Sequence, residues 1–318
     1  NKKTLNLNVM AVLNDSNQYV ASGISVQSVK GATENLTASI IDGTVRFNCT
    51  YPADVDTSKS GYGSHCALAI KPENFKQNGL PTNVATLNIT SVILVSNEYA
   101  LGVFGVKDLK DSPWTDAKIV VNIEGSSLDS QSDASAVSTN GTFGGESITI
   151  SGKSTLNSKD GAAIYAASNG KWKITGSTLT GVSGIDQRSG SISIASSTIN
   201  YNGPTKAVTD SDGPLSFGVG ISVMPNANYS LLGTFMEIGN DVKFKAGEQA
   251  KEQIYVSTFS YATASYDVCF TTASKAVADV HVSYAGFEIK YTKDTAATKA
   301  SALTVADNGK ITVGDGAA

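Results

Sequence analysis

The sequence predicts an all-β fold, with a parallel β-helix in the middle of the chain and antiparallel β regions, a sandwich or capping sheets, on either side. Three observations lead to this prediction. Apolar and polar residues alternate along much of the 318-residue chain, whereas the best helix candidate, residues 246–254, has no apolar stripe. A motif of short apolar segments is repeated in the middle third. Glycine and asparagine separate the segments, as expected for tight turns.

The N-terminal region, residues 1–83, begins with a strand-like segment. Leu5, Leu7, Val9 and Leu13 lie on one face of this segment because they occupy alternate positions. The segment stands close to the first residue of the sequence, so a neighbouring molecule could receive it as a donated strand. Pairing within its own domain is the alternative. The strand-like runs that follow are expected to pair antiparallel.

Four segments in the middle third share one pattern: apolar-x-apolar, a small residue at a bend, and another apolar residue. Their anchoring isoleucines, Ile123, Ile150, Ile174 and Ile194, are 27, 24 and 20 residues apart. A repeat of this length cannot bury its apolar side alone, so successive copies are expected to stack. The sequence therefore predicts a coil of parallel strands over residues 84–215.

The periodicity and the turn after each anchor, as in Ile174-Thr-Gly-Ser-Thr-Leu179, resemble the right-handed parallel β-helices of pectin-lyase-like surface proteins. The resemblance covers residues 84–215 and includes no catalytic motif. It implies a rigid coil whose corners carry loops of variable length. An antiparallel β-sandwich with evenly spaced hairpins is the competing fold. A leucine-rich horseshoe fits less well, because no asparagine or cysteine recurs at a fixed offset.

Residues 216–318 contain longer strand-like segments between polar turns, which predicts a β-sandwich or a capping sheet. Asn308 and Gly309 stand between the alternating segments Leu303–Val305 and Ile311–Val313, a strong signal for a β-hairpin. Flanking β elements of this kind are one way to cover the open strand edges of a coil.

The composition excludes several classes of function. Charged residues make up only 16% of the chain, whereas serine and threonine together number 69. The 24 lysines and arginines are outnumbered by 28 acidic residues and form no basic stripe, so no nucleic-acid partner is expected. No apolar run approaches the roughly 20 residues of a transmembrane helix. The hydroxyl-rich surface favours a secreted, cell-envelope or cell-surface location.

The three cysteines do not form a metal-binding pattern. Cys49 and Cys66 are 17 residues apart and could close a loop through a disulfide, which would leave Cys269 free. The odd number and the wide spacing argue against zinc and against a disulfide framework. Asp210 and Asp212 resemble part of a calcium loop but lack the other spaced ligands, so calcium is only a minor alternative to having no cofactor.

The resemblance also implies where a catalytic site would lie if the chain were an enzyme. Pectin-lyase-like enzymes place acidic and basic residues on neighbouring turns of the coil. The matching candidates are Asp160, Asp186 and Asp210, with Arg188 beside them. Their offsets from the anchoring isoleucines are 10, 12 and 16 residues, so vertical alignment is not implied. Solvated aspartates at glycine-rich turns are the competing interpretation.

Two aromatic residues are candidates for sugar binding. Tyr165 and Trp172 occupy strand positions in the repeat and would form a stacking platform if both were exposed. The alternative places Tyr165 in the core and Trp172 on an outer face.

These observations favour a non-catalytic, extracellular structural or adhesive surface protein, such as a filament subunit that self-associates through Leu5, Leu7, Val9 and Leu13. Its expected partners are other copies of the chain or a cell-surface glycan. A polysaccharide lyase or hydrolase of the β-helix type, or a glycan-binding module without turnover, is the alternative.

Overall fold

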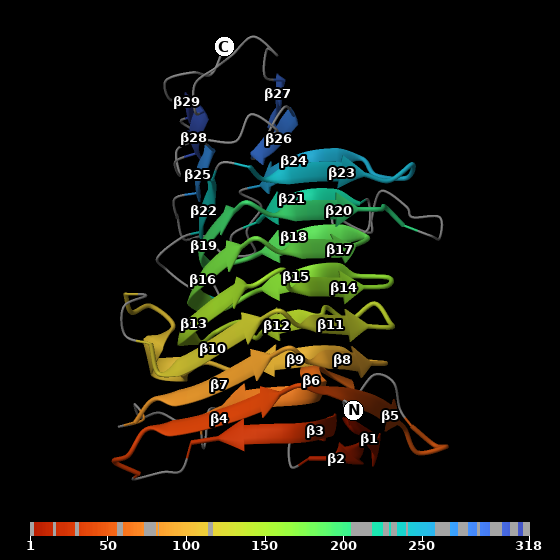
Figure 1. The fold of residues 1–318 in the computed structure, drawn as a ribbon. Helices are drawn as coiled ribbons and strands as arrows, with labels where there is room; N and C mark the ends of the chain where they lie inside the picture. Colours follow the sequence, from red (N-terminus) through yellow and green to blue (C-terminus); the bar gives the residue numbers. More distant parts are fainter. Residues whose placement is uncertain are drawn as a thin grey trace.

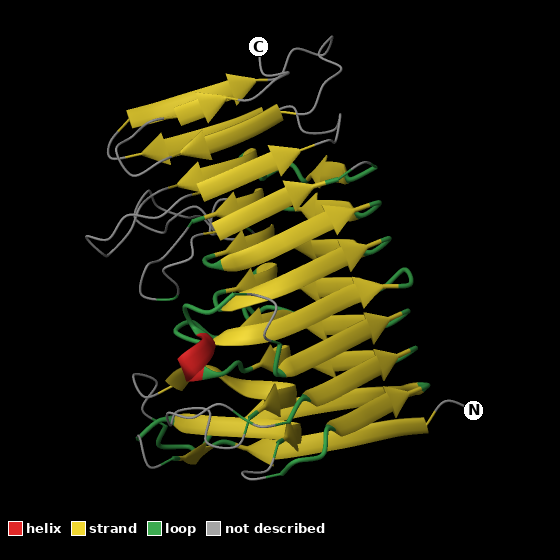
Figure 2. Ribbon diagram, turned by 90° about the vertical axis from the view of Figure 1, so that its left-hand side faces the viewer, coloured by secondary structure: helices red, strands yellow, loops and turns green. Residues whose placement is uncertain are grey.

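The chain rises in stacked turns, and each complete turn contributes one strand to each of three sheets (Figures 1 and 2). For residues 60–64, and from Ser257 onward, the description covers the backbone alone. The computed structural model describes residues 3–14, 17–28, 32–55, 60–72, 81, 83–113, 117–204, 218–224, 229, 234–239, 241–257, 268–272, 279–284, 287–292, 301–305 and 311–313.

The three sheets are named A, B and C. Sheet A contains, in spatial order, β1 (Lys3–Met10), β5 (Gly43–Thr50), β8 (Ile93–Ser96), β11 (Ser127–Ser130), β14 (Thr155–Ser158), β17 (Thr178–Gly181), β20 (Thr198–Tyr201) and β23 (Lys243–Ala246). Sheet B contains β2 (Val12–Leu13), β3 (Tyr19–Gln27), β6 (Ser60–Lys71), β9 (Tyr99–Val103), β12 (Val137–Thr139), β15 (Ala162–Ala166), β18 (Ser183–Gln187), β21 (Val219–Val223), β24 (Glu252–Ser257), β26 (Asp279–Tyr284) and β27 (Phe287–Thr292). Sheet C contains β4 (Leu36–Ile41), β7 (Ala85–Thr90), β10 (Ile119–Glu124), β13 (Gly144–Ser151), β16 (Asn169–Thr175), β19 (Gly190–Ala195), β22 (Thr234–Ile238), β25 (Val268–Thr272), β28 (Ser301–Val305) and β29 (Ile311–Val313).

The predicted all-β fold and parallel coil are confirmed, and the parallel pairing extends beyond residues 84–215 on both sides. It begins with β1 on β5 and β3 on β6, and it continues to β24 on β26. The antiparallel pairing expected for both flanks is found, among the described strands, only in β2–β3, β26–β27, β25–β28 and β28–β29. Side chains alternate between the two faces of a sheet in parallel and in antiparallel strands. The alternating pattern of the N-terminal residues therefore does not reveal that their strands pair in parallel.

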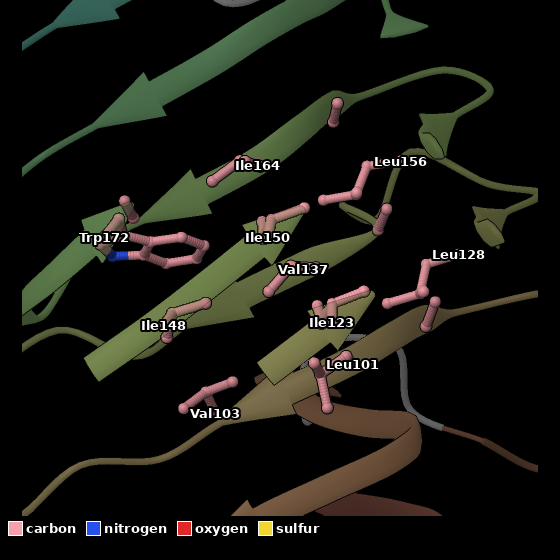
Figure 3. Close-up of a cluster of buried hydrophobic side chains, with 14 of the residues drawn as sticks. Leu101, Val103, Ile123, Leu128, Val137, Ile148, Ile150, Leu156, Ile164 and Trp172 are labelled. Atoms are coloured by element: carbon pink, nitrogen blue, oxygen red, sulfur yellow. The ribbon is translucent and has the colours of Figure 1, made fainter. Parts of the chain in front are cut away.

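Aliphatic ladders fill the interior of the coil (Figure 3). Because the strands pair in register, each inward residue lies above its counterpart in the previous turn. In sheet A the ladder consists of Leu94, Leu128, Leu156, Leu179 and Ile199, all fully buried. Burial of one such side chain stabilises the fold by about 1.5–3 kcal/mol.

The repeated Gly-Ser turn forms the corner between sheets C and A. Gly125 and Gly176 adopt φ angles of 56° and 59°, which a glycine reaches without steric cost. The serine that follows points into the corner: Ser126 Oγ accepts a hydrogen bond from the Val92 N–H at 3.0 Å. Ser197 Oγ accepts one from the Ser177 N–H at 3.1 Å, one turn below. The motif thus satisfies backbone donors that the bend would leave unpaired.

The described strands also settle two smaller points. β28 and β29 pair antiparallel, as the Asn-Gly signal predicts, although the connection itself lies outside the described residues. None of the helical segments described in the chain has the length and apolar character needed to cross a membrane.

Candidate functional site

A row of outward-facing side chains runs up the middle of sheet B. Ser138, Tyr165, Asp186, Ser222 and Tyr255 occupy equivalent positions on five successive strands. The residue before each belongs to the buried core, so alternation directs this row to the outer surface of the sheet. Parallel pairing therefore brings together residues that are 21 to 36 positions apart in neighbouring strands.

An ion pair lies at the centre of this row. Arg188 Nε is 2.9 Å from Oδ1 and 3.0 Å from Oδ2 of Asp186. The Asp186 side chain is fully buried, whereas the Arg188 side chain is 24% exposed. Burial raises the pKa of Asp186, and the Arg188 guanidinium opposes that rise. Burial lowers the pKa of Arg188, but the Asp186 carboxylate more than offsets this effect.

Two tyrosines lie beside the pair. The hydroxyls of Tyr165 and Tyr229 are 3.4 Å apart. Burial, followed by the charge of Asp186, raises the pKa of Tyr165, so its hydroxyl stays protonated. The ring of Tyr229 fills the space above Gly141, where any Cβ would collide with it. Gly141 therefore permits the close approach that holds Tyr229 over sheet B.

Described residues engage only part of the Arg188 guanidinium. Only its Nε group contacts Asp186, and neither Nη group has a partner within the described part of the chain. Next to Asp186, the hydroxyl of Ser222 is buried and forms no hydrogen bond with a described residue. These groups suit an oxyanion or a sugar hydroxyl. Asp186 itself is enclosed and paired, which does not suit a general acid or base.

The predicted carboxylate group is only partly assembled. Asp186 and Arg188 are in contact, but Asp160 lies in the bend before β15 and is not the residue of that strand in register with Asp186, which is Tyr165. Asp160 instead contacts Lys159, at 3.9 Å from Nζ to Oδ2. Asp210 and Asp212 lie outside the described residues.

The predicted aromatic platform is wrong. Tyr165 is on the outer face of sheet B, whereas Trp172 is 1% exposed and lies inside sheet C between Ile148 and Ile192 (Figure 3). The alternative, which places Tyr165 in the core and Trp172 on an outer face, is also wrong, because Trp172 is the residue in the core. The two rings occupy different sheets, so they share no surface.

The disulfide allowed by the sequence is not formed. Cys49 on β5 and Cys66 on β6 are both buried, and no disulfide joins them. Burial raises the pKa of Cys49 to about 11 and that of Cys66 to about 12, so both are unreactive thiols at neutral pH. The side chain of Cys269 lies outside the described residues.

The predicted assembly strand is paired within its own chain. β1 pairs with β5 along all eight residues, and β1 is the terminal strand of sheet A. Leu5 and Leu13 are each 46% exposed, whereas Leu7 and Val9 are half-buried against the core. The strand is therefore an edge and not a free arm.

A second polar cluster was not predicted from the sequence. The Tyr51 hydroxyl donates a hydrogen bond to Glu98 Oε1 at 2.9 Å, and its ring lies 5.5 Å from that of His65. Burial raises the pKa of Glu98, while the Tyr51 hydrogen bond and His65 lower it. His65 is 4% exposed, and its Nε2 has no partner among the described residues. No local motif joins these residues, because only the register of the coil makes them neighbours.

The described residues contain no group of three or more His, Cys, Asp or Glu side chains arranged to hold a metal ion. Comparison of the chain with protein-family models, curated proteins and solved structures finds no match in any of the three.

Proposed function

We propose that the chain is a non-catalytic structural or adhesive module of an extracellular or cell-surface protein, and that it self-associates through one end of its coil. The observation that carries this proposal is the distribution of exposed apolar side chains. Six large hydrophobic residues are exposed in the described part of the chain, and five belong to the terminal strands β1, β2 and β4. They are Leu5, Met10, Val12, Leu13 and Ile41, with Ile93 as the exception.

Such a concentration of apolar surface favours association. Exposed apolar patches on otherwise polar proteins mark interaction surfaces. An unpaired strand edge can accept a strand from another molecule. From Thr4 to Leu13 the edge carries no charged residue, so it has none of the charges that commonly prevent edge-to-edge pairing.

The polar sites support a non-catalytic role. Asp186 is buried and neutralised by Arg188, and Asp160 contacts Lys159. The hydroxyl-rich composition supports a secreted, cell-envelope or cell-surface location. The three parallel sheets support a relation to pectin-lyase-like surface proteins.

Size-exclusion chromatography with light scattering, followed by negative-stain microscopy, tests self-association. The wild-type chain is expected to form dimers or larger assemblies whose mass rises with concentration. The double variant Met10→Lys/Val12→Lys is expected to be monomeric, because desolvating two new charges opposes contact at this end. Ile93→Lys places the same charge on an exposed apolar position of an inner strand and should assemble like wild type. A wild-type monomer at all concentrations would refute the assembly role.

Glycan binding is the second candidate. It is favoured by the Nη groups of Arg188, which have no partner among the described residues, and by the outward Tyr165 nearby. It predicts saturable binding of a glycan with no cleavage products. Tyr165→Phe should weaken binding without unfolding the coil, whereas Thr155→Ala, on the outer face of sheet A, should leave affinity unchanged. Equal glycan affinity of wild type, Tyr165→Phe and Thr155→Ala would exclude this site.

A further inference from the structure

Glu146 is a fully buried carboxyl group that the proposed function does not use. It stands on β13, at the irregularity in register between Gly144 and Ser147. Neither of its carboxyl oxygens, nor the buried hydroxyl of Ser168, forms a well-aligned hydrogen bond with a described residue. The Ser168 hydroxyl and nearby backbone N–H groups therefore offset only part of the cost of burying the carboxylate. A buried charge without a counter-ion is costly, so the neutral form fits this position better.

Two glycines enclose the carboxyl group. A Cβ on Gly105 would collide with Oε1, and a Cβ on Gly170 would lie 3.0 Å from Oε2. Gly105 belongs to the segment 104–113 that leaves the coil after β9, and Gly170 is on β16. The carboxyl group thus fills a space between an inserted segment and the next turn of the coil.

Among the described side chains, no counter-ion contacts this carboxyl group. Glu146 forms no ion pair among the described residues, and Lys110 contacts Asp111 instead. The charged side chains on the described elements packed around Glu146 are Lys107 and Asp108 in the 3₁₀ turn, Lys110 and Asp111 directly after it, Lys118 before β10, Glu124 on β10, and Lys171 and Lys173 on β16.

The same position is where the inserted segment attaches to the coil. The Val106 N–H donates to the Gly144 carbonyl at 2.8 Å, and the Gly144 N–H donates back at 3.0 Å. Farther along, Asn169 Nδ2 donates to the Ser112 carbonyl at 2.8 Å. Gly105, next to Val106, covers Glu146 directly. Water can therefore hydrate this carboxyl group only if the segment lifts away.

We propose that Glu146 is a proton-controlled latch, which holds segment 104–113 against β13 when its carboxyl group is protonated and releases the segment when it is ionised. The neutral group fits between the two glycines without a counter-ion. The ionised group needs water, and opening of the segment supplies it.

The direction of the pH effect follows from linkage. Burial raises the pKa of Glu146 from 4.5 to about 7, opposed by Ser168 and by backbone N–H groups. Between pH 4.5 and about 7, the Glu146 carboxyl group is therefore protonated when segment 104–113 is closed and ionised when the segment is open. Opening becomes about tenfold more favourable for each pH unit between roughly 4.5 and 7, and levels off above that range.

Hydrogen exchange followed by mass spectrometry on the complete chain, corrected for intrinsic rates, tests the latch. Between pH 5 and 7.5, protection of segment 104–113 is expected to fall by about 100-fold in wild type. It should stay constant in Glu146→Gln, which is neutral throughout. Peptides from β17 and β20 should keep their protection in both chains, which separates local opening from global unfolding. Unchanged protection in wild type, or the same pH dependence in Glu146→Gln, would overturn the latch.

A measurement on wild type covers the case in which Glu146→Gln does not fold. In a chain labelled with ¹³C-glutamate, one carboxyl resonance should titrate near neutral pH, with a midpoint that matches the loss of protection. Titration of every glutamate below pH 5.5 would overturn the proposal.

Discussion

At the scale of single residues, the corner between sheets C and A depends on backbone conformation. Gly176 has a φ of 59° and open space where a Cβ would be, whereas Ser196 holds the equivalent corner at 49°. A left-handed conformation costs a residue with a Cβ about 1–2 kcal/mol. The same turn is therefore strain-free in one repeat and strained in the next.

This contrast predicts opposite effects for two substitutions. Gly176→Ala should lower the free energy of unfolding by about 1–2 kcal/mol through its backbone conformation alone, because the new methyl group meets no neighbour. Ser196→Gly should raise it by up to about 1 kcal/mol, reduced by the greater entropy of the unfolded chain. Denaturant titration of both variants measures the two changes. Destabilisation by Ser196→Gly would mean that the serine side chain contributes more than its strain costs.

At the scale of elements, strand β18 shows how register creates a polar site. Asp186 is on β18 and Arg188 is the first residue after this strand, whereas Tyr165 and Ser222 come from the strands on either side. A buried ion pair of this kind contributes little net stability, because desolvation offsets attraction. Removal of one partner, however, leaves an unpaired charge.

The ion pair predicts a strongly non-additive double-mutant cycle. Arg188→Met should destabilise the chain by about 3–5 kcal/mol, because it leaves the enclosed Asp186 carboxylate without its cation. The double variant Asp186→Leu/Arg188→Met should recover most of that loss. Urea unfolding at neutral pH of wild type, both single variants and the double variant gives the coupling energy. Additive effects would show that the pair is not coupled in the folded state.

At the scale of the whole molecule, the coil behaves as a stack in which each turn contacts only its neighbours. Terminal turns of such a stack have a partner on one side only and open more readily than inner turns. β1 lies at this position in sheet A, with exposed Leu5 beside it, whereas β14 lies between β11 and β17.

This asymmetry predicts concentration-dependent protection of one end. In dilute solution, the amides of β1 should exchange faster than those of β14. At high concentration, β1 should gain protection if its edge is covered by another copy, and Met10→Lys/Val12→Lys should not show this gain. Hydrogen exchange at two concentrations makes the comparison. Equal protection of β1 at both concentrations, in a chain shown to assemble, would place the contact elsewhere.

The sequence alone determined the properties that depend on local pattern. The period-two alternation, the spacing of Ile123, Ile150, Ile174 and Ile194, and the Gly-Ser corner together indicate stacked strands, because each reflects a constraint within one turn. The same reasoning identified Asp186 and Arg188 as neighbours, since they are close in the chain.

Only the tertiary structure decided which residues share a surface. The parallel partners of β1 and β3 lie tens of residues away, and alternation looks alike in parallel and antiparallel strands. Trp172 faces inward because it is in register with Ile148, and Glu146 is enclosed because it is in register with the buried Ile119. Register leaves no local signal, because it results from the packing of one turn upon the next.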